Sequence, residues 1–275
     1  MKLEMSLHTQ RVCVWAGPAF VVLFFLGFGG LAGWVPPASP GDSAATIARM
    51  YRDNHDMIRL GLIITSMCSA LLLPFFAAIS TQMARIEGRP RTLTYLQLAA
   101  GALACLEFIF PVMIWQAAAF RLDRSDEEIR LLNDLGWLPF LGIVSTAIVQ
   151  GIAIGVAILQ DQNEQPIFPR WSGYFNIWVI SLLAPGGIIV FFQSGPFAWN
   201  GLLAWWLVLA AYFSWIMVNT GLLLRAIKQQ SDTTATAADG ETDTRSRDET
   251  ERELDALRRR LDALESVRGG QPARG

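Results

Sequence analysis

The sequence predicts an all-α membrane protein: a polytopic bundle of six transmembrane helices, followed by a C-terminal cytoplasmic helix of amphipathic, coiled-coil character. The composition is 52% hydrophobic and 17% charged, with a mean hydropathy of +0.35, which is too apolar for an ordinary soluble domain. Crossing a bilayer takes about 20 apolar residues. Such stretches occupy residues 12–35, 57–83, 93–120, 135–159, 174–193 and 202–224.

The composition also excludes several classes of protein. A net charge of −2 gives no basic footprint for nucleic acid. Cys13, Cys68 and Cys105 lie inside apolar stretches, and their spacing suits neither a disulfide framework nor a zinc site, so we expect free thiols. His8 and His55 lie outside these stretches, where they cannot hold a haem or a di-iron site between helices. We therefore expect no metal and no cofactor.

Two GxxxG pairs predict close helix packing, Gly29 with Gly33 in the first stretch and Gly151 with Gly155 in the fourth. The motif is common in membrane helices, so it does not imply a specific dimer. A signal peptide is the competing interpretation of the first stretch. Its apolar run is longer than the roughly 7–15 residues of a signal peptide core, which favours an uncleaved helix.

The polar connection 36–56 contains a short helix. Ser43 can cap it, and Ile47, Met50 and Tyr51 fall on one side. We interpret it as a helix on the membrane surface. The alternative is a lid over a site between the spans.

The third stretch carries a carboxylate, Glu107, near its centre. An ionisable group at that depth costs at least a few kcal/mol, and no Lys, Arg or His lies in the middle of any span to pair with it. Desolvation favours the neutral carboxyl, which can donate one hydrogen bond and accept others. We expect a site for a substrate or a proton around Glu107, with Gln150 and Ser181 as partners and Gln97 on the same helical stripe.

Three prolines predict helix breaks inside spans: Pro74, Pro111 and Pro185. Pro111 has no N–H to give the Glu107 carbonyl, so a carboxyl and a free carbonyl lie at one depth. Prolines in the second and fifth spans also permit an inverted three-plus-three repeat, a transporter pattern. Only the residues around the two prolines match between the halves. Proline is frequent in membrane helices, so an inverted repeat and a chance match both remain open.

Residues 121–134 are charged and mostly acidic, which predicts a solvated loop. The ordered spacing of a calcium loop is missing. Tryptophans near span ends predict anchors at the membrane–water interface. These are Trp34, Trp137, Trp171 and Trp199.

The composition changes after residue 228, which ends the predicted membrane domain. Residues 229–249 suit a flexible linker, residues 250–268 a short charged leucine helix, and residues 269–275 a disordered end. The leucine spacing predicts a parallel homodimer through this helix, and a lone charged helix is the alternative. The leucines concerned are Leu254, Leu257, Leu261 and Leu264.

Short loops rich in Lys and Arg stay in the cytoplasm. The basic turn at Arg85, Arg89 and Arg91 predicts a multi-pass protein of the cytoplasmic (inner) membrane with both termini cytoplasmic. The count of basic residues is eight on that side against six on the other. The eight are Lys2, Arg11, Arg85, Arg89, Arg91, Arg170, Arg225 and Lys228, and the six are Arg49, Arg52, Arg59, Arg121, Arg124 and Arg130.

Three segments resemble bacterial polytopic membrane proteins that have no assigned activity. They are Ser43–Tyr51, Leu131–Trp137 and Gly195–Gly201. The resemblance covers residues 10–228 and implies a bacterial membrane protein, without a site to carry over.

Three functions remain open from the sequence. A small-molecule transporter or permease with a polar site at Glu107 is the favoured one, its ligand unknown. The alternative is a membrane-anchored assembly or accessory protein that presents its C-terminal helix to a partner or a second copy, and truncation after Lys228 discriminates between them. A lipid enzyme would need a nucleophile, metal or paired-acid motif, and none is found, so we do not expect an enzyme.

Overall fold

The computed structural model describes residues 2–234, 236 and 259. The chain divides into two units, Met1–Ile227 and Lys228–Gly275. The first unit holds the helical bundle. The predicted leucine helix, with Leu254, Leu257, Leu261 and Leu264, lies outside the described residues, as does the predicted disordered end.

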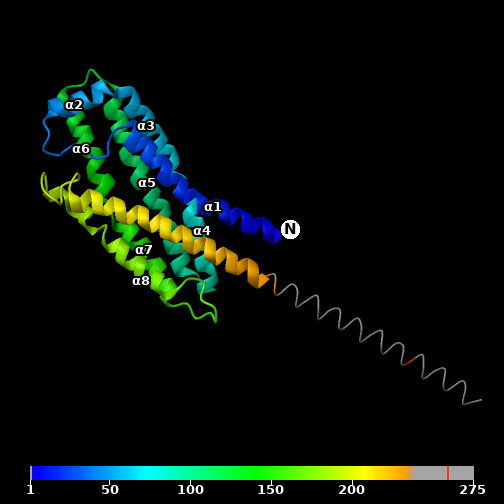
Figure 1. Ribbon diagram of the computed structural model, residues 1–275. Coiled ribbons are helices and arrows are strands. Elements are labelled where there is room, and N and C mark those ends of the chain that lie inside the picture. Colours follow the sequence, from blue (N-terminus) through cyan, green and yellow to red (C-terminus); the bar gives the residue numbers. More distant parts are fainter. Residues whose placement is uncertain (1, 235, 237–258, 260–275) are drawn as a thin grey trace, which may run out of the picture. The chain divides into compact units, whose positions relative to one another are not determined.

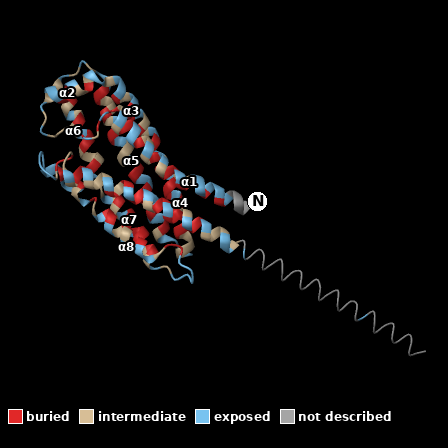
Figure 2. Cartoon of the chain, viewed as in Figure 1, coloured by how far each residue is buried: buried red, intermediate tan, exposed pale blue. Residues whose placement is uncertain are grey.

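Within residues 2–234, six apolar helical segments are long enough to cross a membrane, which confirms the predicted all-helical, multi-span class. Their outer faces are apolar as well, since each one exposes a large hydrophobic side chain, and burial is concentrated on their inner faces (Figure 2). A surface of this kind suits lipid. The segments are Ser6–Leu31, His55–Glu87, Thr92–Phe120, Asp126–Leu159, Arg170–Phe191 and Leu202–Thr234. Exposed examples, one from each, are Val22, Met67, Phe110, Ile152, Trp178 and Met217.

Only the third of these segments is a single uninterrupted α-helix, α5. Helix α5 (Thr92–Phe120) contacts four of its neighbours, α3, α4, α6 and α7. At one end of the bundle lie α2 and α6, and the N-terminus lies at the other (Figure 1). The remaining elements are α1 (Lys2–Phe24), η1 (Phe25–Leu31), α2 (Ala44–Asp53), α3 (His55–Ser69), α4 (Leu72–Glu87), α6 (Asp126–Gly142), α7 (Ser145–Leu159), α8 (Arg170–Ser181), η2 (Ala184–Phe191) and η3 (Leu202–Trp206).

Prolines act on these helices in three different ways. Pro74 lies in the first turn of α4, directly after a break at residues 70–71, because its missing N–H and its ring disfavour continuation from α3. Pro185 is the second residue of the 3₁₀ helix η2, which follows the end of α8. Pro111 lies inside α5, which continues past it without a break. A further break, at residues 143–144, follows Pro139 and was not predicted.

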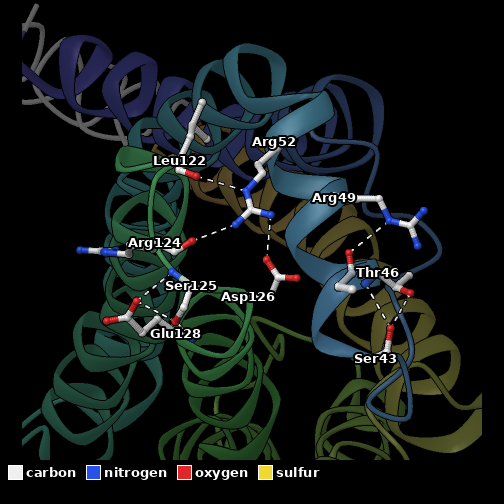
Figure 3. Close-up of polar contacts among 10 residues, drawn as sticks. Ser43, Thr46, Arg49, Arg52, Leu122, Arg124, Ser125, Asp126 and Glu128 are labelled. Atoms are coloured by element: carbon white, nitrogen blue, oxygen red, sulfur yellow. Dashed lines mark hydrogen bonds and ion pairs between the residues drawn. The ribbon is translucent and has the colours of Figure 1, made fainter.

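The acidic segment 121–134 is a loop only as far as Ser125, which corrects the expectation of a solvated loop throughout. Helix α6 begins at Asp126 with a capping box: Ser125 accepts from the Glu128 N–H, and the Glu128 carboxylate accepts from the Ser125 N–H at 2.9 Å (Figure 3). The three acidic residues of its first turn also complement the helix dipole.

Helix α2 is capped by Ser43, as expected, and its buried residues pack against α6 and α3. Arg52 ties it to the α5–α6 loop. The guanidinium donates to the carbonyls of Leu122 at 3.1 Å and Arg124 at 2.8 Å, and to Asp126 at 2.7 Å (Figure 3). Burial raises the pKa of the Tyr51 phenol well above its usual value, so the hydroxyl stays protonated and donates to Asn133 at 3.3 Å.

Arginine side chains donate hydrogen bonds to the backbone carbonyls at the C-terminal end of α5. Arg59 donates to the Ala119 carbonyl at 2.7 Å and the Phe120 carbonyl at 3.1 Å, and Arg124 donates to the Ala117 carbonyl. The last carbonyls of a helix have no partners within it, and cations there also complement the dipole. Arg52, Arg59 and Arg124 therefore serve the fold at this end of the bundle, whichever side of the membrane it faces.

The two glycine pairs behave differently. Gly151 and Gly155 lie against α8, where an added Cβ would come within 2.8 Å of Ile180 and 2.6 Å of Ile177, respectively. The first pair does not face a second helix. Gly29 lies nearest to Val35 of its own segment, and Gly33 follows the helix with φ +70° and open space around it.

In the first span, Gly27 makes the close approach instead. An added Cβ on Gly27 would meet the Gly61 carbonyl of α3 at 2.7 Å.

Three of the four tryptophans expected at the interface are buried in the bundle, which corrects their interpretation as anchors. Trp34 is 2% exposed, Trp137 1% and Trp199 6%, whereas Trp171 is 54% exposed. The buried rings belong to a continuous aromatic cluster. Phe28, for example, lies 5.4 Å from Trp34, 5.9 Å from Trp137 and 6.0 Å from Trp205 between ring centroids.

The sixth span, Leu202–Thr234, extends beyond the expected end at residue 224. Residues 229–234 of the predicted linker are therefore helical, and most of the rest of that segment lies outside the described residues.

Candidate functional site

A cavity of about 80 Å³ lies beside Glu107. It exceeds several-fold the roughly 10–15 Å³ that one water needs, so a few waters or a compact organic molecule can enter. Its wall is mostly aromatic and aliphatic. Six aromatic residues contribute to it: Phe24, Phe108, Phe140, Trp205, Tyr212 and Phe213.

Irregular backbone forms part of this wall. Ile143 and Val144 come from the break between α6 and α7, and Leu183 comes from the break between α8 and η2. These breaks are adjacent, because Gly186 of η2 lies so close to α6 that an added Cβ would meet the Leu141 carbonyl at 2.4 Å. Trp205 comes from η3, the π-helical start of the sixth span. Three departures from α-helical geometry therefore meet at one cavity.

Glu107 is half-buried at the middle of α5 and lines the cavity. Its carboxyl accepts a hydrogen bond from the Thr146 hydroxyl. Thr146 is the second residue of α7, so the carboxyl lies at the positive end of that helix dipole. Across residues 2–234 of the structure, no Lys, Arg or His forms an ion pair with Glu107.

Two buried donors in the cavity wall lack a hydrogen-bond partner. They are the indole N–H of Trp205, whose side chain is 1% exposed, and the hydroxyl of Tyr212. Tyr212 lies within electrostatic range of Glu107. Buried polar groups are nearly always hydrogen-bonded, to protein or to a bound molecule. The two donors therefore indicate a ligand or water in the cavity.

A second polar group lies between α4, α5 and α7. The Ser80 hydroxyl donates to Oε1 of Gln97, and both side chains are buried. Gln150 approaches the same helix from α7, because a Cβ added at Gly101 would lie 2.6 Å from its Nε2. Within the described chain, Nε2 of each glutamine has no partner.

The predicted site residues thus fall in two places. Glu107 lines the cavity, while Gln97 and Gln150 lie nearer the α4–α5 turn, along the same α5–α7 interface. Gln150 lies one helical turn after Thr146 on α7. Ser181 is not brought to Glu107: it is exposed, and its hydroxyl donates to the Ile177 carbonyl of its own helix at 2.8 Å.

Thr146, Trp205 and Tyr212 were missed from the sequence. Thr146 lies one helical turn before Gln150, so the stripe through Gln150 contained the signal for it. The breaks that bring Trp205 and Tyr212 to the cavity have no comparable signal. No residue of α2 lines the cavity, so the lid alternative has no support at this site.

Among residues 2–234, 236 and 259, no cluster of His, Cys, Asp or Glu could hold a metal ion. Comparison with protein-family models, curated proteins and solved structures finds no match to this chain. A carboxyl without a cation, among aromatic rings and two free donors, can bind a small polar molecule with an apolar body.

Proposed function

We propose that the protein is a small-molecule transporter or permease whose substrate site is the cavity beside Glu107. The observation that carries the proposal is the meeting of three irregular segments at this cavity. Irregular backbone at membrane depth is tolerated where it lines a cavity, and discontinuous helices form the substrate sites of many transporters. A bundle that only anchors a tail has no need of such breaks.

The polar side chains along α5 and α7 support a route to this cavity from the α4–α5 turn. At that turn Glu87 accepts from the N–H of Thr94 at 2.7 Å. Gln97 and Gln150 follow deeper in the bundle, and beyond them the Thr146 hydroxyl donates a hydrogen bond to Glu107. Polar groups are costly inside a membrane, so a series of them along one helix interface favours a pathway for a polar solute or a proton.

Transport by the full chain in lipid vesicles tests this proposal. A panel of labelled organic cations, amino acids, carboxylates and sugars is offered to vesicles holding the native chain, Glu107→Gln or Ser181→Ala. We expect at least one solute to enter native vesicles tenfold faster than Glu107→Gln vesicles, with Ser181→Ala like native. Equal rates for the native chain and Glu107→Gln across the whole panel would contradict a permease at this site.

A further inference from the structure

The wall of the cavity carries the elements that recognise an organic cation. Six aromatic residues surround the space beside one carboxyl. Aromatic faces attract ammonium groups, by about 0.5–2 kcal/mol for each contact, and rings combined with a carboxylate suit alkylated ammonium better than any neutral or anionic group.

An anion is disfavoured by the same residues. Glu107 already occupies the N-terminal end of α7, where a bound anion would otherwise be stabilised. A second negative charge would lie next to the carboxyl, in a wall with no Lys, Arg or His. The site therefore selects against carboxylate and phosphate ligands.

The two free donors define the other end of the ligand. The Trp205 N–H can only donate, and the Tyr212 hydroxyl can donate or accept. A ligand that satisfies both needs an oxygen acceptor a few bonds from its cationic centre. The apolar wall around them suits a compact carbon skeleton.

We infer that this cavity binds small ammonium compounds that carry a hydroxyl or carbonyl oxygen, in exchange for the Glu107 proton. The inference deepens the permease proposed above and rests on it for any movement across the membrane. The ammonium group pairs with Glu107, and the oxygen accepts from Trp205 and Tyr212. Ile143, one of the wall residues, is itself 42% exposed.

The exchange conserves charge. The free site holds a neutral carboxyl, and the occupied site holds a carboxylate paired with one cation. One proton leaves Glu107 for water as one cation enters, and no bond other than the O–H bond is broken. The other titratable groups near Glu107 in the described chain are Tyr212, from the sixth span, and Cys105 of α5; helix α7 contributes none.

Three probes of the same size test the ligand class on the purified full chain in detergent. Choline carries both the cation and the oxygen, 3,3-dimethylbutanol replaces the nitrogen with carbon, and propyltrimethylammonium replaces the hydroxyl with methyl. We expect choline to bind at least tenfold more tightly than either analogue. Titration in a weakly buffered solution should release about one proton per choline bound. The affinity for choline should therefore fall tenfold for each unit by which the pH is lowered, over the range in which free Glu107 is protonated.

Variants assign the roles. Glu107→Gln should abolish both choline binding and proton release. Trp205→Phe and Tyr212→Phe should reduce the preference for choline over propyltrimethylammonium while keeping cation binding. Ser181→Ala should bind choline like the native chain. Thermal unfolding of each variant establishes that it is folded.

Three results would overturn the inference: equal binding of choline and dimethylbutanol, choline binding that survives Glu107→Gln, and no choline binding by the native chain. Other results would contradict the permease proposal without contradicting the cation site, or the reverse. Choline binding without choline flux in vesicles would contradict transport and leave the cation site standing. Glu107-dependent flux of a sugar or an anion, with no choline binding, would keep the permease and overturn the cation site.

Discussion

A single carboxyl in a membrane bundle has two roles that a static contact does not separate. Its bond with Thr146 joins α5 to α7 and stabilises the fold, while its place in the cavity makes it available to a ligand. Hydrogen bonds between membrane helices contribute on average about 0.6 kcal/mol and at most about 2 kcal/mol. The structural part of the role is therefore small enough for variants at Glu107 to fold.

We predict that the effects of substitutions at Glu107 and Thr146 on the free energy of unfolding are coupled. Thr146→Val should lower the free energy of unfolding by about 0.6–2 kcal/mol, and Glu107→Ala should cost less in that background than in the native chain. Glu107→Gln, which keeps an acceptor oxygen, should be milder than Glu107→Ala. Unfolding in detergent micelles measures the three single variants, Thr146→Val, Glu107→Ala and Glu107→Gln, and the double variant of Thr146→Val with Glu107→Ala.

Thr81→Val is the matched control for Thr146→Val. The Thr81 hydroxyl is exposed and donates to the Ala77 carbonyl of its own helix at 2.9 Å, so its loss should change unfolding little. Additive effects of Glu107→Ala and Thr146→Val would mean that the two side chains do not interact.

The sequence located Glu107 but not its partner, for a physical reason. Helical periodicity assigns residues to a face of their own helix, here Gln97 and Glu107 on one stripe of α5. It does not say which helix faces that stripe. Gln150 was on the right helix, one turn from the true partner, whereas Ser181 points outward because α8 turns its other face to α7.

At the scale of the element, the ends and interruptions of the helices were the least predictable features. The signal for α6 was present, since Ser125 and Glu128 have capping-box spacing, but the charge density of the segment favoured a loop. The break after Pro139 had a proline signal of its own. Pro111 carries the same signal without any break in α5, a helix that packs along its length against α3, α4, α6 and α7.

The Arg52 contacts predict how α2 is held. Arg52→Ala removes two hydrogen bonds to carbonyls and one to Asp126. It should lower the free energy of unfolding by about 1–2 kcal/mol. Loss of a fully buried network would cost more, because the Arg52 side chain is 34% exposed. Arg49→Ala is the matched control: among the described residues its guanidinium donates a hydrogen bond to the Ala45 carbonyl of its own helix and to no other element (Figure 3). Limited proteolysis and thermal unfolding measure both. Equal effects would mean that Arg52 does not hold α2.

The contact of α7 with α8 makes a second prediction. Gly151→Ala places a Cβ 2.8 Å from the Ile180 Cβ, and overpacking of this kind costs about 1–3 kcal/mol. Gly221→Ala in the sixth span has nothing within 4 Å and should be neutral or stabilising. Thermal unfolding distinguishes them, and a neutral Gly151→Ala would mean that these helices are further apart.

At the scale of the whole molecule, the arginines bear on orientation. Half of the six basic residues on the side opposite the termini are engaged in the fold: Arg59 and Arg124 donate to the last carbonyls of α5, and Arg52 donates to the α5–α6 loop. These contacts, two at the end of a helix and one to a loop, explain the presence of the three arginines there without a role in orientation. The basic turn at Arg85, Arg89 and Arg91 then remains the main orienting signal.

We therefore predict that both termini lie in the cytoplasm. A cysteine at Gln162, between the fourth and fifth spans, should resist a membrane-impermeant label in intact cells, whereas one at Asp123 should react. Both residues are exposed, and neither change removes a basic residue. Labelling at Gln162 with protection at Asp123 would reverse the orientation.

Glu107 is a half-buried carboxyl without a cation partner among residues 2–234, in a cavity inside the bundle. Infrared difference spectroscopy of the native chain and Glu107→Gln measures its protonation directly. We predict a protonated-carboxyl band at pH 7 that is missing in Glu107→Gln, and that choline removes in the native chain as the proton is displaced. An ionised Glu107 at pH 7, with no cation added, would contradict this description.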